Sequence, residues 1–222
     1  MNSELQMVSG ESISMRKVVY SVIKRFADII CGIIGFILLI PITLIVKVVY
    51  ICSRDFNSIF FVQDRIGLNG KSFKLYKFRT MVPNADEILF KTLEMDKIAA
   101  EEYRINKKFK DDPRVTKVGK IMRKLSLDEL PQLVNVLKGE MSLIGNRPYL
   151  PREKEDMGEF YDDIIKTKPG LTGYWQVNGR SNTTFRKRLE LESYYSLHKS
   201  FKLDVKIFFK TFSVVLFGKG AK

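Results

Sequence analysis

The feature that most constrains this chain is an uncharged apolar run of eighteen residues near its N-terminal end, Ile29–Val46, which reads IICGIIGFILLIPITLIV. As an α-helix the run would reach ~27 Å, which is marginal for a hydrocarbon core of ~30 Å. Pro41 lies inside it, and a proline in a helix interior leaves the carbonyl four residues back, here that of Ile37, without its donor. The run therefore predicts a membrane segment with a break or bend at Pro41.

Both flanks of this run are basic: Arg16, Lys17, Lys24 and Arg25 come before it, and Lys47 and Arg54 follow it. A helix that crosses the membrane usually shows a positive bias on its cytoplasmic side only. Positive charge at both ends favours a helix that enters, bends at Pro41 and leaves on the same side. A single crossing helix with a kink stays open, because proline is common in membrane helices.

The overall charge requires an anionic partner. Lys and Arg number 38 against 25 Asp and Glu, a formal charge of +13. Anionic lipid, phosphorylated substrates and nucleic acid would all satisfy this excess, and charge does not choose among them. The two cysteines, Cys31 and Cys52, form no metal-like spacing with the single histidine, His198, so a reducing compartment is expected.

The remainder of the chain reads as a mixture of short strands and helices. Ile59–Gln63 and Phe73–Phe78 are expected to be strands around the turn at Gly67–Gly70. Glycine- and proline-rich loops are expected at 145–151 and 168–173. Helices are expected at Asn84–Lys110, Thr116–Lys124, Asp128–Leu137 (stopped by Gly139) and Arg186–Tyr195.

The C-terminal segment Leu203–Phe217 has the pattern of an amphipathic helix. Its apolar face comprises Val205, Phe208, Phe209, Phe212, Val215 and Leu216. Lys202, Lys206 and Lys210 form a basic stripe at four-residue spacing. This pattern is typical of a helix in the lipid headgroup plane, although a helix packed on the domain core would also show it.

The stretch RKLSLDELPQL, Arg123–Leu133, is the most informative for chemistry. Proline is tolerated only in the first turn of a helix, so Pro131 predicts that a helix begins at or just before Asp128. Asp128 and Glu129 would then lie at the positive end of the helix dipole, with Arg123 upstream. An ionised carboxylate there could act as a nucleophile or metal ligand, but acids at a helix start are more often simple caps.

Three further clusters could bind a phosphate or a nucleotide. Arg147 follows Gly145 and precedes Pro148, and a guanidinium can bind phosphate through two bonds. Lys77 and Arg79 stand two residues apart at a strand end, where both could face one phosphate. The loop GLTGYWQVNGR, 170–180, contains Trp175, Gln176 and Arg180 and could stack on a base or sugar. Each cluster also has an ordinary structural interpretation, as a solvated side chain, a strand face or a packing turn.

Taken together, these segments resemble the bacterial sugar transferases, the monotopic polyprenyl-phosphate phosphoglycosyl transferases. The matching pieces are KRFAD (24–28), FVQDRIGLNGKSFKLYKFRTM (61–81), DPRVTKVGKIMRKLSLDELPQL (112–133), GEMSLIGNRP (139–148) and GLTGYWQVNGR (170–180). The chain departs from the family pattern at Asn146, where a proline usually precedes the arginine.

The resemblance implies a fold and a reaction. It implies an α+β, mostly helical monotopic membrane protein with a re-entrant helix hairpin in residues 1–54, broken at Pro41. Residues 55–222 would form a cytoplasmic catalytic domain with a small β-hairpin and amphipathic interfacial helices. The implied reaction transfers a sugar-1-phosphate from a UDP-sugar to undecaprenyl phosphate through a covalent intermediate on Asp128, with release of UMP.

The resemblance also assigns roles to the candidate residues. Asp128 would be the nucleophile, and Glu129 would help it to hold Mg²⁺. Arg123, Lys77, Arg79 and Arg147 would bind phosphate, and Trp175, Gln176 and Arg180 would bind the nucleotide. The expected partners are a UDP-sugar, undecaprenyl phosphate and membrane lipid, without nucleic acid, and homodimer formation stays open. The expected location is the cytoplasmic face of a bacterial cell membrane.

Two other functions compete with this interpretation. A membrane-anchored Leloir glycosyltransferase would move a sugar without its phosphate and release UDP. A non-enzymatic basic protein that binds anionic lipid would account for the charge and the anchor, but not for the combination of adjacent acids and arginine loops. The sequence does not reveal which sugar is moved.

Overall fold

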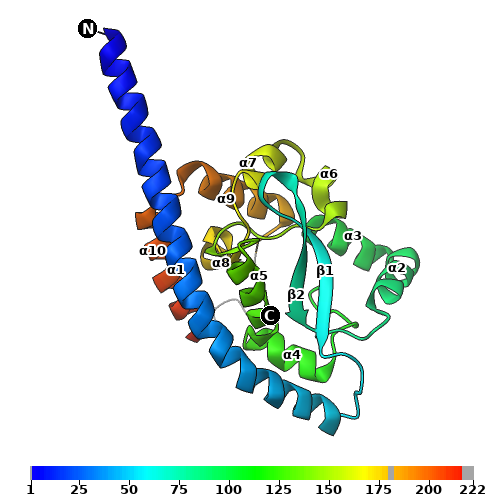
Figure 1. The fold of residues 1–222 in the computed structure, drawn as a ribbon. Helices are drawn as coiled ribbons and strands as arrows, with labels where there is room; N and C mark the ends of the chain where they lie inside the picture. The colour runs from blue at the N-terminus through cyan, green and yellow to red at the C-terminus, as the bar shows by residue number, and fades with distance from the viewer. Residues whose placement is uncertain (1, 180–182, 217–222) are drawn as a thin grey trace.

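A computed structural model of the chain describes residues 2–179 and 183–216. Helices predominate and surround two small sheets (Figure 1). The helices are α1 (Asn2–Cys52), α2 (Ala85–Met95), α3 (Lys97–Asn106), α4 (Lys117–Lys124), α5 (Leu133–Lys138), α6 (Lys154–Met157), α7 (Tyr161–Ile165), α8 (Tyr174–Asn178), α9 (Phe185–His198) and α10 (Phe201–Leu216). Short 3₁₀ turns are η1 (Leu68–Gly70), η2 (Leu127–Gln132), η3 (Pro151–Glu153) and η4 (Gly158–Phe160). The expected α+β, mostly helical fold is confirmed.

The N-terminal helix α1 passes through Pro41 without interruption. It bends along its length but does not fold back on itself (Figure 1). The segment that was expected to form a helix hairpin broken at Pro41 is therefore one continuous, bent helix. The hydroxyl of Thr43 donates to the carbonyl of Leu39 at 2.7 Å, beside the proline. A proline and a threonine bonded in this way bend a helix without ending it.

Helix α1 also carries the membrane contact. Among the described residues, one helix, over Met15–Cys52, is long and apolar enough to cross a membrane. Along much of this stretch the large apolar side chains are exposed, including those of Ile33, Ile37 and Leu44. An exposed apolar surface of this extent marks a membrane interaction site, so the chain is membrane-associated.

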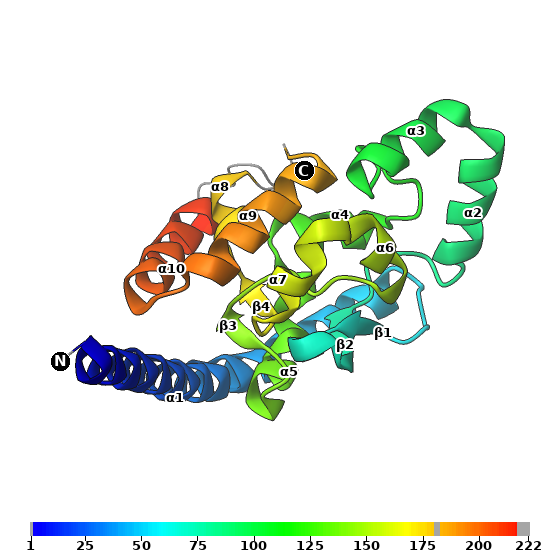
Figure 2. The same ribbon diagram turned by 90° about the horizontal axis from the view of Figure 1, so that it is seen from above.

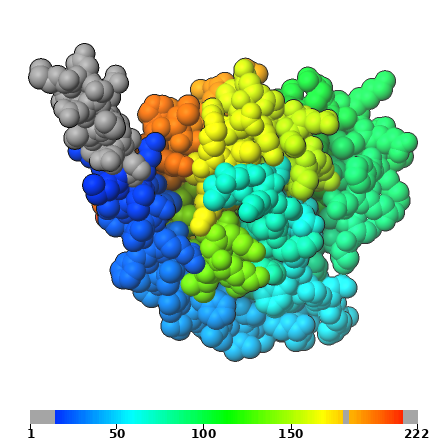
Figure 3. Space-filling view, turned by 45° about the horizontal axis from the view of Figure 1, so that its top comes forward, coloured from blue at the N-terminus to red at the C-terminus, as the bar shows by residue number. Residues whose placement is uncertain are grey.

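The opposite face of α1 packs against the rest of the protein. Leu39, Val46 and Tyr50 are buried with Phe78 and Met122 in one apolar cluster. Gly32 and Gly35 lie against leucine side chains of α5, where the lack of a Cβ permits the two helices to approach closely. Seen from above, α1 runs beneath α5 and the strands, and α2 and α3 lie at the far side of the molecule (Figure 2). In the space-filling view, α1 (blue) lies at the left and along the lower edge, and α2 and α3 (green) lie at the right (Figure 3).

The two sheets differ in how well the sequence predicted them. β1 (Phe60–Ile66) and β2 (Ser72–Phe78) form the expected antiparallel hairpin, with Phe60 opposite Phe78. β3 (Ser142–Ile144) and β4 (Gly170–Thr172) form a parallel pair; β4 lies in the expected loop at 168–173, and no strand was expected at β3. Their pairing requires glycine, because a Cβ on Gly170 would collide with the backbone of Gly145. Strands of only three residues carry little strand signal of their own.

The remaining expected elements are present with shifted bounds. The region Asn84–Lys110 divides into α2 and α3, with Asp96 capping α3 through its side chain. Thr116 caps α4 in the same way.

Helix α10 corresponds to the expected C-terminal amphipathic helix. The side chains of Val215 and Leu216, which belong to its expected apolar face, lie outside the described ones. On α10, Asp204 and Ile207 are buried whereas Phe209 and Phe212 are exposed, so this helix both packs on the domain and presents an apolar face.

Asn135 joins α5 to the hairpin and provides a test of this architecture. Its fully buried amide donates to the carbonyl of Lys74 (2.6 Å) and to Glu140 (2.7 Å), and its oxygen accepts from the amide of Tyr76 (3.1 Å). We predict that Asn135→Ala, which leaves these buried groups unpaired, lowers stability by about 3 kcal/mol.

The measurement is the thermal unfolding temperature in detergent micelles. Asn178→Ala is the matched control, because the exposed Asn178 side chain donates to the carbonyl of Tyr174 and accepts from Lys210 at the surface, and so leaves no buried group unpaired. It should change stability by less than about 0.5 kcal/mol. Equal unfolding temperatures for the two variants would contradict the role of Asn135.

Candidate functional site

A sharp turn between α4 and α5 carries the two adjacent acids. Ser126 adopts the left-handed conformation (φ 55°), and η2 follows with Asp128 and Glu129 in its first turn. The expected helix at Asp128–Leu137 thus begins as a 3₁₀ turn and becomes α-helical only from Leu133. It ends at Gly139, which is left-handed (φ 83°) as the sequence predicted.

Asp128 is buried in the wall of a cavity of about 400 Å³. Asp128 is 9% exposed, and burial raises the pKa of its carboxyl group. Lys77 and Arg123 act in the opposite direction and lower that pKa, whereas Glu129 raises it. The ionised form expected from the helix dipole therefore depends on two cations brought in from β2 and α4.

Both cations have defined positions. The ammonium of Lys77 donates to Glu129 Oε1 at 3.0 Å, so the hairpin and η2 are tied together at the acidic pair. The guanidinium of Arg123 donates through Nε to the Thr80 hydroxyl at 3.0 Å. The structure thus brings Lys77, Arg123, Asp128 and Glu129 together, as the sequence predicted.

Arg79 lines the same cavity but has other partners. Its guanidinium donates to the carbonyl of Ser58 (2.7 Å), the carbonyl of Met81 (3.2 Å) and the carboxylate of Asp55 (2.9 Å). It also lies over the ring of Tyr50. These contacts join α1 to the end of the hairpin and use three of the five N–H donors of the guanidinium group. They give Arg79 a structural role, and its expected role in holding phosphate stays a prediction.

The cavity as a whole is positively charged. Nine basic residues and five acidic residues line it. The basic residues are Arg65, Lys77, Arg79, Lys107, Lys108, Arg114, Arg123, Arg147 and Arg152. Such a wall concentrates anions, and arginine guanidinium groups suit phosphate oxygens in particular.

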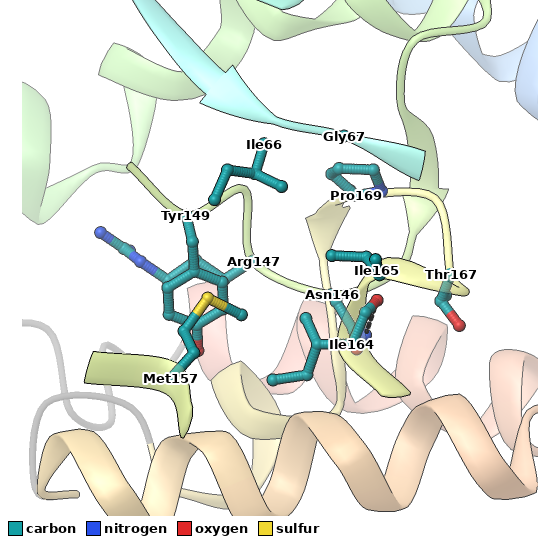
Figure 4. A pocket seen from close by; sticks show the side chains of 10 residues that line it. All are labelled: Ile66, Gly67, Asn146, Arg147, Tyr149, Met157, Ile164, Ile165, Thr167 and Pro169. Carbon is teal, nitrogen blue, oxygen red and sulfur yellow. Dashed lines mark hydrogen bonds between the residues drawn. The ribbon is translucent and has the colours of Figure 1, made fainter. Parts of the chain in front are cut away.

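The loop at Asn146–Pro148 holds Arg147 at the edge of this cavity. Its backbone amide donates to Glu192 of α9 at 2.8 Å. The side-chain amide of Asn146 donates to the carbonyl of Ile164 (3.1 Å) and to Ser196 (2.6 Å). Figure 4 shows Asn146 directed at Ile164, with Arg147 extending away from both. Hydrogen bonds of Asn146 thus support the loop at the position where the family pattern usually has proline.

Trp175 lies between two guanidinium groups. Those of Arg147 and Arg188 stand 5.9 and 4.7 Å from its ring centre, respectively. The indole nitrogen of Trp175 and Oε1 of Gln176 are buried and have no hydrogen-bond partner within the described part of the chain. The nucleotide-binding roles of Trp175 and Gln176 stay predictions, and Arg180 lies outside the described residues.

Helix α9 supplies two buried charges that the sequence interpretation missed. Arg188 is 3% exposed and Glu192 is 1% exposed. Burial, followed by the charge of Arg147, lowers the pKa of Arg188 to about 10. Burial raises the pKa of Glu192 to about 8, although the bond from Arg147 and the charges of Arg147 and Arg188 lower it. The four-residue spacing of the pair was visible in the sequence, but it is also typical of an exposed helix face.

Arg65 on β1 was missed as well. It donates to the carbonyl of Pro148 at 2.9 Å and to Gln63 at 2.7 Å, so it links the Arg147 loop to β1. Burial and the charge of Arg147 lower the pKa of Arg65 to about 10. Arg147 therefore repels both Arg65 and Arg188, which an anion bound near these three residues would relieve.

Two carboxylates are available to a metal ion. Among the described residues, no three His, Cys, Asp or Glu side chains come together as a preformed metal site. Mg²⁺ commonly takes one or two protein carboxylates and completes its octahedron with substrate phosphates and water. Asp128 and Glu129 are adjacent oxygen donors beside a phosphate-attracting wall, so this site fits Mg²⁺ together with a phosphorylated substrate.

Comparison with known proteins decides the family. The family model for bacterial sugar transferases matches residues 19–218, which include α1 from Val19 and the whole site. The chain belongs to the bacterial sugar transferase family. The resemblance seen in its motifs is thereby confirmed.

Relatives share much of the chain. It is 42% identical over 201 residues to an exopolysaccharide production protein ExoY of Sinorhizobium fredii, covering 89% of this chain and 87% of that protein. It is 44% identical over 199 residues to an undecaprenyl-phosphate galactose phosphotransferase of Salmonella typhimurium, covering 90% and 41%. It is 34% identical over 197 residues to a UDP-glucose:undecaprenyl-phosphate glucose-1-phosphate transferase of Escherichia coli, covering 85% and 39%. The chain thus spans less than half the length of the last two proteins.

The buried carboxyl group of Glu192 predicts a pH-dependent stability. Because its folded pKa lies above that of an ordinary glutamate, the folded state retains a proton that the unfolded chain has lost between about pH 4.5 and 8. This contribution is present at pH 5 and is lost as the pH rises through 8. We expect it to amount to at most about 5 kcal/mol.

The measurement is the thermal unfolding temperature between pH 5 and 9. Glu192→Gln, which is neutral at all these values, should lose less stability over this range than the unmodified chain. Glu190→Gln is the control, because Glu190 lies half-exposed on the same helix in an ion pair with Lys187. If Glu192→Gln retained the full slope, another group would be responsible.

Proposed function

We propose that this chain transfers a sugar-1-phosphate from a UDP-sugar to a polyprenyl phosphate, undecaprenyl phosphate in particular, and releases UMP. The observation that carries the proposal is the buried carboxyl group of Asp128 in a cationic cavity, with Lys77 and Arg123 as the nearby charges that lower its pKa. The names of the Salmonella and Escherichia coli relatives, an undecaprenyl-phosphate galactose phosphotransferase and a glucose-1-phosphate transferase, support the same class of reaction.

In the first step a carboxylate oxygen of Asp128 attacks the phosphorus that bears the sugar. A bond forms between that oxygen and phosphorus, and the bond from phosphorus to the bridging oxygen of the diphosphate breaks. UMP leaves with the bonding electron pair, and an acyl phosphate that carries the sugar remains on Asp128. Burial removes water from the carboxylate and raises its pKa, whereas the charges of Lys77 and Arg123 lower that pKa and so favour the ionised form that attacks phosphorus.

In the second step an oxygen of polyprenyl phosphate attacks the same phosphorus. The bond to Asp128 breaks, and the carboxylate is regenerated while the lipid diphosphate sugar leaves. Two successive displacements require only one bulky phosphorylated substrate at the nucleophile at a time. Arg147, with Arg65 and Arg188 behind it, would hold phosphate oxygens at the far wall of the cavity.

Mg²⁺ is proposed as the cofactor, with Asp128 and Glu129 as its protein ligands. Bound there, it would neutralise phosphate charge and favour departure of UMP. Lys77, which donates to Glu129, would hold that carboxylate in place beside Asp128.

The proposed location is the cytoplasmic face of a bacterial cell membrane. In this topology α1 enters the membrane and leaves it on the same side. The bend of α1 and the basic residues at both of its flanks support this topology. The interfacial role of α10, the domain boundary at residues 54 and 55 and homodimer formation stay predictions.

A Leloir glycosyltransferase remains the alternative, and the nucleotide product distinguishes the two. Sugar transfer without phosphate would release UDP and would leave no phosphorylated enzyme. A lipid-binding protein without activity would release no nucleotide. The sugar itself is open, and a panel of UDP-sugars assayed for UMP release with undecaprenyl phosphate would identify it.

Asp128→Asn and Asp128→Ala should lower transfer by about 1,000-fold or more, because neither side chain can attack phosphorus. The unmodified chain, given UDP-sugar without acceptor, should gain the mass of one sugar phosphate in intact-protein mass spectrometry. Peptide mapping should place the adduct on Asp128.

Asp64→Asn is the control for this experiment. Asp64 lies on β1 in an exposed ion pair with Lys74, and its loss should change the rate by less than about twofold. The unfolding temperatures of all variants should match. Near-normal turnover by Asp128→Ala, or UDP as the product, would exclude covalent catalysis through this residue.

The topology of α1 is tested by cysteine labelling in intact cells. In a Cys31→Ser background, Cys52 reports the flank after Lys47, and Ser21→Cys with Cys52→Ser reports the flank before Arg25. A membrane-impermeant maleimide applied from outside should leave both positions unlabelled, since both flanks face the cytoplasm.

Lysed cells provide the control, because both positions should be labelled there. Labelling of one flank but not the other in intact cells would mean that α1 crosses the membrane, and the monotopic topology would be wrong.

A further inference from the structure

A second cavity lies on the other side of η2 from the cationic one. Its volume is about 340 Å³, and it is enclosed by α1, η2, both strands of the parallel sheet, α8 and α10. Asp128 lines the cationic cavity, whereas its neighbours Leu127 and Leu130 line this second one. The 3₁₀ turn η2 thus lies between the cationic cavity and a second cavity with a mostly apolar lining.

The lining of the second cavity is apolar. Ten of the fifteen residues that form it are apolar or cysteine, and Glu129 is the one charged residue among those described there. Thr172 and Thr211 bond to each other through their hydroxyls at 2.9 Å, so their polar groups are directed at one another. A hydrocarbon would enter this lining without leaving a buried charge unpaired.

The position of the cavity relates it to the membrane. Cys31 reaches its wall from the apolar segment of α1, and Phe208 and Phe212 reach it from α10. Phe212 and Leu125 at its rim are themselves exposed, so the cavity opens at the apolar surface formed by these elements. A chain embedded in the bilayer can therefore reach it without passing through water.

The same cavity shares part of its wall with a polar hollow that belongs to the phosphate-binding region. Glu129, Leu171 and Gln176 line both the cavity and this hollow. That hollow includes Lys77 and Arg147. A molecule with an anionic head at Lys77 and Arg147 and an apolar tail beyond Glu129 would fit both.

We infer that the apolar cavity binds the first isoprene units of the polyprenyl phosphate acceptor, next to its phosphate. This inference rests on the proposed function and adds to it a subsite for the lipid chain. A cavity of about 150 Å³ accommodates benzene, so 340 Å³ provides room for on the order of ten carbon atoms, or two isoprene units. The acyl chain of an ordinary phospholipid is the competing occupant.

The test fills the cavity and measures each half-reaction separately. Thr211→Phe places a ring in the cavity, and Ser213→Phe, at an exposed position of α10, is the matched control. The apparent KM of Thr211→Phe for geranyl phosphate and undecaprenyl phosphate should rise about tenfold or more, and that of Ser213→Phe should stay within about twofold. UMP release from UDP-sugar without acceptor should be unchanged in both variants.

The outcomes separate this inference from the proposed function. No UMP release by the unmodified chain would count against the proposed function itself. The subsite would be overturned if both variants released UMP normally and their KM values for both acceptors matched those of the unmodified chain. A matching unfolding temperature shows that Thr211→Phe is folded, and Val177→Phe, on α8, repeats the test from another wall.

Cys31 provides a readout that does not depend on turnover. In a Cys52→Ser variant it is the remaining cysteine, and it lines the cavity. Undecaprenyl phosphate should slow its reaction with N-ethylmaleimide about fivefold or more, and phosphatidylglycerol at the same mole fraction should not. Equal protection by phosphatidylglycerol, or none by undecaprenyl phosphate, would overturn the inference.

Discussion

The attachment of α1 to the catalytic part of the chain depends on polar side chains just before its apolar run. Arg25 donates to the last carbonyls of α5, at 2.6 and 2.8 Å, and so caps the helix that follows Asp128. Asp28 accepts from Ser142 and from the amide of Leu143 at the start of the parallel sheet. Lys24 pairs with Asp204 of α10. Three elements around the site are thereby held at a set depth relative to a helix that lies in lipid.

The site combines charges that would oppose one another without a substrate. Burial and the charge of Arg147 lower the pKa of Arg65 and of Arg188, and burial raises the pKa of Asp128. In the proposed reaction, a diphosphate substrate would supply the negative charge that this arrangement lacks, and release of UMP would remove part of that charge again. Glu192 neutralises part of this charge only when ionised, which its burial opposes. The cationic wall therefore suits a pocket that exchanges anionic ligands.

Much of the fold could be predicted because its signals are local. The β-hairpin follows from alternating strands around Gly67–Gly70, and the end of α5 follows from Gly139, which adopts the left-handed conformation. Motifs correctly placed Asp128, Glu129, Lys77 and Arg123 in one region. The parallel sheet could not be predicted, because three-residue strands gain their pairing from close backbone contact at Gly145 and Gly170. The partners of Arg79 lie 24 and 21 residues away, at Asp55 and Ser58, and spacing does not reveal them.

The apolar helix, the excess of positive charge and the acidic pair followed by proline can all be read from the chain alone, because each depends on composition or on neighbouring residues. The folded arrangement was needed to show which cations surround Asp128, that Glu192 of α9 accepts the Arg147 amide and that Arg188 lies over Trp175. It also decided that α1 bends without breaking. Burial and long-range pairing set the charge state of a side chain, and neither is encoded in the spacing of residues along the chain.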